Sequence, residues 1–219
     1  LHQEALKLFT DIKTSGEGGE MLLYLLAERF LKLPQVLCKM DLKTDSRMHY
    51  HGADGVYASV SRHEVLHLYW GESKIYADAA NATRECLASL APFLLEVDAD
   101  DATRERDLIL LRDKADLDDP NLTAAFRNYF DRTKPLSNRV RYCGLALVGF
   151  DADFYPSGDA QVAADAMAEA ARKQIERWKS QLGNRLTEEK LQQFQIEFLC
   201  VPLPSAEGFR DAFLKALGL

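Results

Sequence analysis

A glutamate and a lysine two residues apart, Glu72 and Lys74, are of the types that metal-assisted hydrolysis uses. They lie in residues 65–76, whose Val, Leu, Tyr and Trp content predicts a β-strand. In a strand both side chains point to one face, about 7 Å apart along the backbone. The carboxylate can bind a hard divalent cation, and the ammonium can polarise a water or neutralise charge on a phosphate. An ordinary surface ion pair has the same pattern, so the assignment depends on further ligands.

Asp54 is the candidate for the second carboxylate. It precedes residues 55–61, another run with strand character, and stands 18 residues before Glu72. If the two runs form a hairpin, Asp54 lies beside Glu72 across the sheet. Gly52 and Gly55 flank it, so the backbone can turn tightly there and leave room for a substrate.

Two further acids, Glu17 and Glu20, stand three residues apart at the start of residues 17–33, whose apolar stripe predicts a helix. They share one face of that helix. One interpretation is that the helix dipole favours acids in a first turn. The other is that Glu20 reaches the metal as an additional ligand, with Glu17 the weaker candidate. The sequence leaves both interpretations open.

Two other motifs compete with this assignment. Residues 63–67, HEVLH, match the zinc-peptidase pattern HExxH, which needs a helix to bring His63 and His67 to one metal. The run continues into the predicted strand, where the two histidines would be about 13 Å apart, so we rank a zinc peptidase low. Asp41 and Lys43 form a second D-x-K pair, but a helix rather than an acid-bearing strand precedes them.

A cluster of basic residues is interleaved with aromatic residues in the second half of the chain, and phosphate contact is one role for it. A solvated face is the other. The candidates for contact with DNA are Arg127, Arg132, Lys134, Arg139 and Arg141, together with Lys43 and His51. The formal net charge of −7 argues against a protein that coats nucleic acid non-specifically, so a DNA path requires a local basic patch or a partner.

The elements that would position these residues alternate in type along the chain. Strands are expected at residues 36–43, 55–61, 65–76, 140–150 and 195–201. Helices are expected at residues 1–13, 17–33, 78–95, 121–131, 160–182 and 206–217. Residues 96–119, with ten acids against four bases, are expected to form a solvated helix and loop. This order predicts an α/β fold with a mixed sheet between helices.

The 219 residues, 47% hydrophobic and 28% charged, fit one globular domain, with a core at 17–150 and a C-terminal extension at 151–219. The four cysteines form no CxxC pair, which favours buried reduced thiols in a cytoplasmic protein. The sequence has neither an 18-residue apolar run nor a basic-then-apolar leader. It begins at Leu1 rather than Met, so we expect a further piece upstream.

The order of these elements resembles the PD-(D/E)xK nuclease superfamily. An acid-bearing helix comes first, then a strand with Asp54, a strand with Glu72-Ser73-Lys74, and a following helix. Ala53 stands where that name expects proline. More narrowly, three motifs are similar to those of the HamA family. They are Gly19-Glu20 at the start of a Leu-rich helix, HGADG at 51–55 and WGESKIY at 70–76. That family provides the nuclease subunit of the Hachiman antiphage-defence system. The similarity covers most of the chain.

The resemblance implies a restriction-endonuclease-like fold and a DNA-degrading effector that associates with a helicase partner, HamB. It implies that Asp54, Glu72, Glu20 and the main-chain carbonyl of Ser73 bind Mg²⁺ or Mn²⁺. Lys74 would orient the water that attacks the DNA phosphodiester. The alternative is a catalytically decayed nuclease fold that serves as an interaction module, with residues 96–119 as its docking surface.

Overall fold

The computed structural model describes residues 16–38, 53–95, 103–113, 120–131, 133–156 and 162–218. Its centre is a five-stranded mixed sheet in which the strands follow chain order from edge to edge. They are β1 (Gln35–Cys38), β2 (Gly55–Val60), β3 (Leu66–Tyr76), β4 (Val140–Asp151) and β5 (Ile196–Leu203). The β1/β2 and β2/β3 pairs are antiparallel, whereas β3/β4 and β4/β5 are parallel. The pairing therefore changes at β3.

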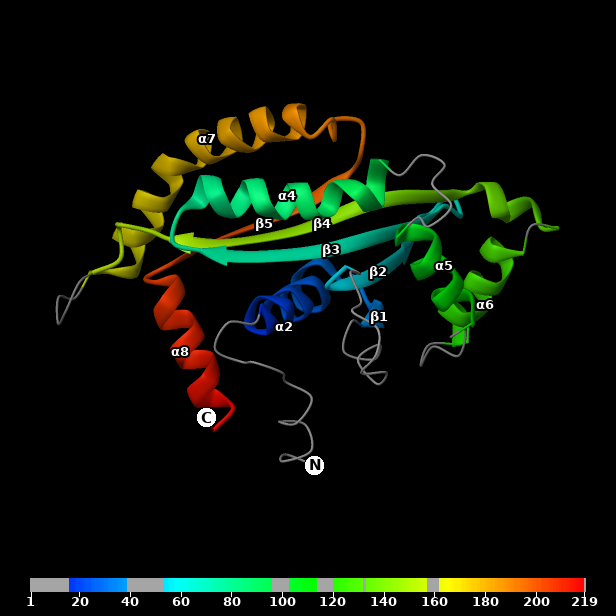
Figure 1. Cartoon of the computed structure of the whole chain (residues 1–219), viewed down its shortest axis with the longest axis horizontal. Coiled ribbons are helices and arrows are strands. Elements are labelled where there is room, and N and C mark those ends of the chain that lie inside the picture. Colours follow the sequence, from blue (N-terminus) through cyan, green and yellow to red (C-terminus); the bar gives the residue numbers. More distant parts are fainter. Residues whose placement is uncertain are drawn as a thin grey trace.

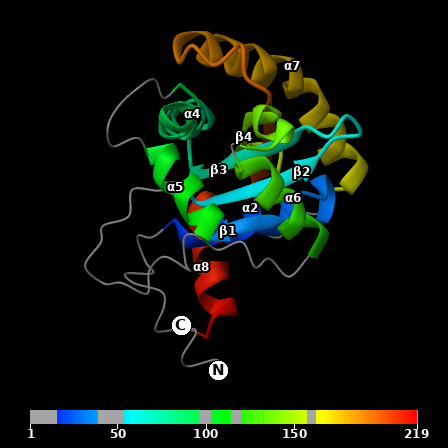
Figure 2. The same cartoon turned by 90° about the vertical axis from the view of Figure 1, so that its right-hand side faces the viewer.

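Helices cover both faces of this sheet. They are α2 (Glu17–Leu26), α4 (Ala79–Leu95), α5 (Thr103–Asp113), α6 (Pro120–Phe130), α7 (Ala164–Glu188) and α8 (Ala206–Ala216). A π-helical turn, Ala27–Leu31, continues α2, and a 3-10 turn, Pro135–Asn138, leads into β4. Helices α4 and α7 lie on one face and α2 and α8 on the other, while α5 and α6 lie near the start of β3 (Figures 1 and 2).

The side chains of β3 alternate between the two faces of the sheet and pack in a hydrophobic cluster on each face. Leu66, Leu68 and Trp70 are fully buried in the cluster that contains the apolar side of α4. Tyr69 and Ile75 point to the opposite face and pack in the cluster that contains Leu23 of α2 and Leu145 of β4. A strand buried on both faces exposes a polar side chain to little water, so each such residue needs a partner.

Local signals in the sequence fix the ends of the helices. Asp78 caps α4, because its carboxylate accepts a hydrogen bond from the main-chain N–H of Asn81 at 2.7 Å. Ser205 caps α8 in the same way and accepts from Gly208 at 3.0 Å. The helical segment that begins with α2 ends at Lys32, whose φ of 55° is left-handed, two residues before Pro34.

The predicted order of strands and helices is confirmed throughout the described residues, with boundaries that shift by a few positions. The expected helix at 1–13 and residues 39–43 of the first expected strand lie outside the described residues. The expected C-terminal extension is structurally continuous with the core sheet, because β5 pairs with β4 over eight residues from Gly144↔Ile196 to Asp151↔Leu203.

The prediction of a solvated acidic segment is wrong for α5. Asp107 is only 1% exposed and accepts a hydrogen bond of 2.8 Å from the indole N–H of Trp70. Leu111 of the same helix is 2% exposed. Charge counting could not detect that one of the acids pairs with a buried tryptophan. Residues 96–102 and 114–119 lie outside the described residues.

The four cysteines are free thiols, as expected, but they are not all buried. Cys86 and Cys143 are buried and Cys38 is half-buried, whereas Cys200, on the edge strand β5, is exposed. Within the described ranges, every helix is too short or too polar to cross a membrane.

Candidate active site

The β2/β3 hairpin brings Asp54 to Glu72, as the sequence predicted. Gly55 is opposite Gly71 in the antiparallel register, so the next pair outward along the hairpin is Asp54 and Glu72. The main-chain N–H of Asp54 donates to the carbonyl of Gly71 at 2.9 Å. Asp54 is 8% exposed and Glu72 5%, so both carboxylates are buried at the end of the hairpin pairing.

Ser73 holds the Asp54 carboxylate in place. Both its main-chain N–H and its hydroxyl donate to Oδ2 of Asp54, each at 2.9 Å. Pairing of β3 with β2 stops at Gly71, so the Asp54 side chain supplies an acceptor that the neighbouring strand no longer offers. This contact fixes the carboxylate to the edge of β3.

The same edge carries the main-chain carbonyl of Ser73. In an extended strand the N–H and C=O of one residue face the same neighbour. Because the N–H of Ser73 meets Asp54, its carbonyl also faces the β2 side of β3. Asp54, Glu72 and this carbonyl thus meet at one end of the β2/β3 pairing, and all three offer oxygen.

Lys74 and Glu72 form an ion pair with 3.2 Å between Nζ and Oε2. The lysine side chain is 25% exposed and the glutamate side chain 6%, so the lysine faces the solvent side of the pair. Burial lowers the pKa of Lys74, but the charges of Glu72 and Asp54 and the hydrogen bond to Glu72 outweigh it, and the net pKa is raised. Without a metal ion Lys74 is therefore a cation at neutral pH.

A buried thiol lies behind the site; burial was expected for this cysteine, but its place against Glu72 was not predicted. Cys86 of α4 donates from Sγ to the carbonyl of Glu72 at 3.4 Å and lies 3.8 Å from the carbonyl of Leu147. Burial raises the pKa of this thiol, and the Glu72 carboxylate raises it further. Cys86 consequently acts as a packed hydrogen-bond donor for the strand and not as a nucleophile.

The start of α2 packs against the site through Gly19. A Cβ atom at this position would lie 3.0 Å from Oγ of Ser73, so any other residue would require Ser73 or the helix to shift slightly. Glu17 is 4% exposed and Glu20 is half-buried. Oε1 of Glu20 lies 4.0 Å from where a Cβ of Gly16 would be, so this carboxylate extends toward the beginning of its own helix.

The donor set fits a hard divalent cation that keeps part of its water. No three His, Cys, Asp or Glu side chains gather closely enough to hold a metal ion among the described residues, so Glu20 as a third carboxylate ligand stays a prediction. Mg²⁺ typically uses one or two protein carboxylates and retains several waters. Asp54, Glu72 and the Ser73 carbonyl provide that number of protein oxygens.

The competing motifs do not form sites in the described residues. His63 lies in a turn, Glu64 has a φ of 56°, and His67 lies in β3, so the prediction that HEVLH is not a helix is confirmed. The pair Asp41 and Lys43, and the candidate DNA-contact residues Lys43, His51 and Arg132, lie outside the described residues.

The remaining basic candidates are exposed but lie away from the carboxylates. Arg141 is opposite His67 in the sheet, five residues before Glu72, which is about 17 Å along the strand. Its side chain also shares the face of Tyr69 and not that of Glu72. Arg139 pairs with Glu64 at 3.6 Å. The structure thus separates Arg127, Lys134, Arg139 and Arg141 from the hairpin end that holds Asp54.

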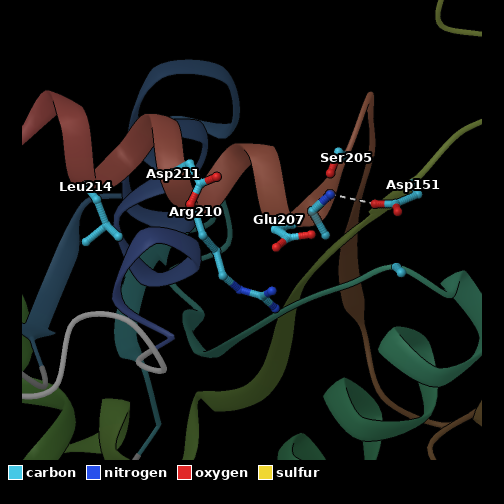
Figure 3. A pocket seen from close by; sticks show the side chains of 8 residues that line it. Asp151, Ser205, Glu207, Arg210, Asp211 and Leu214 are labelled. Atoms are coloured by element: carbon cyan, nitrogen blue, oxygen red, sulfur yellow. Dashed lines mark hydrogen bonds between the residues drawn. The ribbon is translucent and has the colours of Figure 1, made fainter. Parts of the chain in front are cut away.

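Arg210 of α8 reaches the same edge of β3 as the site, although no local pattern in the sequence selects it. Its Nη2 donates to the carbonyl of Ile75 at 2.7 Å, one residue beyond Lys74. The side chain extends from α8 and lines a cavity of about 580 Å³ together with Asp151, Glu207 and Asp211 (Figure 3). The contact joins positions 135 residues apart, which no local pattern reveals.

The fold and the site together define an α/β protein with a buried carboxylate pair, a lysine and an edge carbonyl at the end of an antiparallel hairpin. The HamA family profile matches residues 1–217, and the chain belongs to the HamA family, whose members are components of the Hachiman antiphage-defence system. No curated protein and no solved structure matches the chain.

Proposed function

We propose that this protein is a metal-dependent DNA nuclease, the effector of its Hachiman system, and that a helicase partner controls it. One observation carries the proposal: Ser73 anchors Asp54 beside Glu72, and Glu72 in turn pairs with Lys74. Membership of the HamA family supports the defence role. DNA as the substrate and a helicase as the partner rest on the resemblance of the motifs to HamA and to PD-(D/E)xK nucleases.

In this proposal Asp54, Glu72 and the carbonyl of Ser73 hold Mg²⁺ or Mn²⁺. Such an ion would polarise the phosphate and make a bound water more acidic. Lys74 is a cation beside Glu72, so it donates hydrogen bonds to the attacking water or to a phosphate oxygen and stabilises the negative charge that develops. Because its pKa is raised, Lys74 is protonated in the metal-free protein and acts there as an electrostatic stabiliser and not as a base.

The test is cleavage of supercoiled and linear DNA by the purified full chain, with Mg²⁺ or EDTA, and with or without the helicase partner. Glu72→Gln and Lys74→Ala should each lower the cleavage rate by about 100-fold or more, since each removes charge from the reacting centre. Glu85→Gln is the matched control, because it breaks an exposed pair with Arg84 and leaves the hairpin intact.

Cleavage that survives in folded Glu72→Gln and Lys74→Ala proteins would overturn the assignment of these residues. Absence of cleavage under every condition, together with no heat of Mg²⁺ or Mn²⁺ binding by calorimetry, would instead favour the interaction module.

A further inference from the structure

Two side chains meet the edge of β3 beyond the point where β2 pairing stops. Asp54 accepts from the main-chain N–H of Ser73, and Arg210 donates to the main-chain carbonyl of Ile75. Ser73 and Ile75 are two residues apart, so their main-chain groups face the same edge, about 7 Å apart. The guanidinium of Arg210 thus lies roughly one strand step from the carbonyl that we assign to the metal.

The position of this guanidinium is fixed by the docking of α8. A Cβ atom at Gly18 would lie 3.2 Å from the Phe209 ring and 3.3 Å from the Phe213 ring, which shows how closely α8 packs on the start of α2. The main-chain N–H of Ala206 donates to Oδ1 of Asp151 at 2.5 Å and ties the first turn of α8 to the end of β4. Arg210 is therefore held on packed helices and not on a loop.

The charge of Arg210 has no carboxylate partner among the residues that the structure describes. Ile75 is its one hydrogen-bond partner there. Three carboxylates line the same cavity: Glu207 and Asp211 on the same helix, and Asp151, which accepts from the main-chain N–H of Ala206. A guanidinium has five N–H donors, and one bond to a carbonyl leaves most of them for another acceptor. A cavity of about 580 Å³ opens beside it. Figure 3 shows the side chains that line this cavity.

We propose that Arg210 binds a backbone phosphate of the DNA substrate adjacent to the one that is cleaved. The inference rests on the proposed nuclease function and adds a positioning residue to it. The planar guanidinium matches a phosphate with paired hydrogen bonds, and this match is stronger and more directional than that of a lysine. The Ile75 carbonyl orients the guanidinium beforehand, which reduces the entropy lost on binding.

The experiment measures the salt dependence of duplex DNA binding by fluorescence anisotropy, with Mg²⁺ present and Lys74→Ala in every protein to prevent cleavage. Loss of one phosphate contact lowers the slope of log K against log salt by about 0.9 for duplex DNA. We expect this change for Arg210→Gln, whose amide retains a donor but no charge. Lys215→Gln is the control: it removes the same charge from the same helix, about 140° around it, and should leave the slope unchanged.

Arg210→Lys provides the second measurement, and it keeps the proposal testable if the glutamine variant does not fold. This substitution preserves the charge and loses the planar guanidinium. The slope of log K against log salt should therefore stay the same, while the Kd for duplex DNA should rise several-fold. An unchanged slope in folded Arg210→Gln would show that Arg210 only caps the edge of β3. An unchanged Kd in Arg210→Lys would show that the planar guanidinium makes no paired hydrogen bonds to the phosphate.

The outcome is separable from that of the nuclease proposal. If the wild-type chain cuts DNA and the salt slopes are equal, only the role of Arg210 fails. If the slope falls but the wild-type chain never cuts, the phosphate contact stands and the nuclease activity fails.

Discussion

Ser73 links three roles at the scale of a single residue. Its N–H and hydroxyl hold the Asp54 carboxylate, its carbonyl faces the same edge, and its side chain contacts the start of α2 at Gly19. Hydrogen bonds to a charged group contribute roughly 1.5–3 kcal/mol each, more than those between neutral groups. The middle residue of the Glu-x-Lys triplet is therefore part of the site and not a spacer.

Replacement of Ser73 by alanine removes only the hydroxyl bond and keeps the main-chain bond to Asp54. We expect the free energy of unfolding to fall by about 1–3 kcal/mol and DNA cleavage to slow by roughly tenfold, since the carboxylate is held less firmly. Chemical denaturation and initial cleavage rates measure the two effects. Ser180→Ala in α7, an exposed position, should change neither. A Ser73→Ala protein with wild-type activity would show that the hydroxyl does not position Asp54.

Cys200 gives a pH-dependent prediction at the same scale. Burial raises the pKa of this thiol to about 11, although part of the residue is exposed on the edge strand. The thiolate is the reactive form, so alkylation of Cys200 in a Cys38→Ser protein should accelerate about tenfold per pH unit from pH 7 to 9. An unperturbed thiol, with a pKa near 8.5, should begin to level off over this range. Mass spectrometry of the labelled protein follows the rate, and a plateau below pH 9 would contradict the raised pKa.

At the scale of elements, the close packing of α2 on β3 depends on Gly19. A Cβ there would meet Oγ of Ser73 at 3.0 Å and Cδ1 of Ile75 at 3.5 Å, so the helix or the serine must shift. Gly183 in α7 is the opposite case, because nothing lies within 4 Å of its added Cβ. The two glycines separate the effect of helix propensity from that of contact with the site.

Gly183→Ala should raise the free energy of unfolding by about 0.5–1 kcal/mol, because alanine is the better helix former. Gly19→Ala should lose that gain to the clash and should also slow cleavage several-fold, because Ser73 shifts and loosens Asp54. Thermal unfolding and cleavage rates of both variants test this. Equal stabilisation by both substitutions, with no loss of activity in Gly19→Ala, would show that α2 does not constrain the site.

The elements that carry periodic patterns could be predicted from the sequence, and so could the site residues that lie on them. The alternation of residues 65–76 places Glu72 and Lys74 on one face, and the hairpin follows from two adjacent strand-like runs. Cys86, Asp107 and Arg210 could not be predicted, because their partners Glu72, Trp70 and Ile75 lie 14, 37 and 135 residues away. Such contacts depend on how helices dock, and a single sequence has no local signal for docking.

The whole molecule assembles its site from distant parts of the chain. Gly19 and Arg210 are far apart in the sequence, yet both contact the end of β3 beyond its pairing with β2, at Ser73 and Ile75. Stability of the site is therefore coupled to stability of the entire fold. Asp54 and Glu72 are also buried carboxylates close to each other, an arrangement that a bound cation would stabilise.

Mg²⁺ should accordingly stabilise the whole fold. A ligand that binds only the folded state at 100 times its Kd adds about 2.7 kcal/mol to the free energy of unfolding. For a chain of this size, that corresponds to a rise in Tm of roughly 5–11 °C. Differential scanning fluorimetry across a Mg²⁺ titration measures the shift. Glu72→Gln should abolish most of it, whereas Glu85→Gln should retain it, since Glu85 pairs with Arg84 on the surface. An equal Mg²⁺ response in both variants would place the cation away from the hairpin and remove the metal from the proposed mechanism.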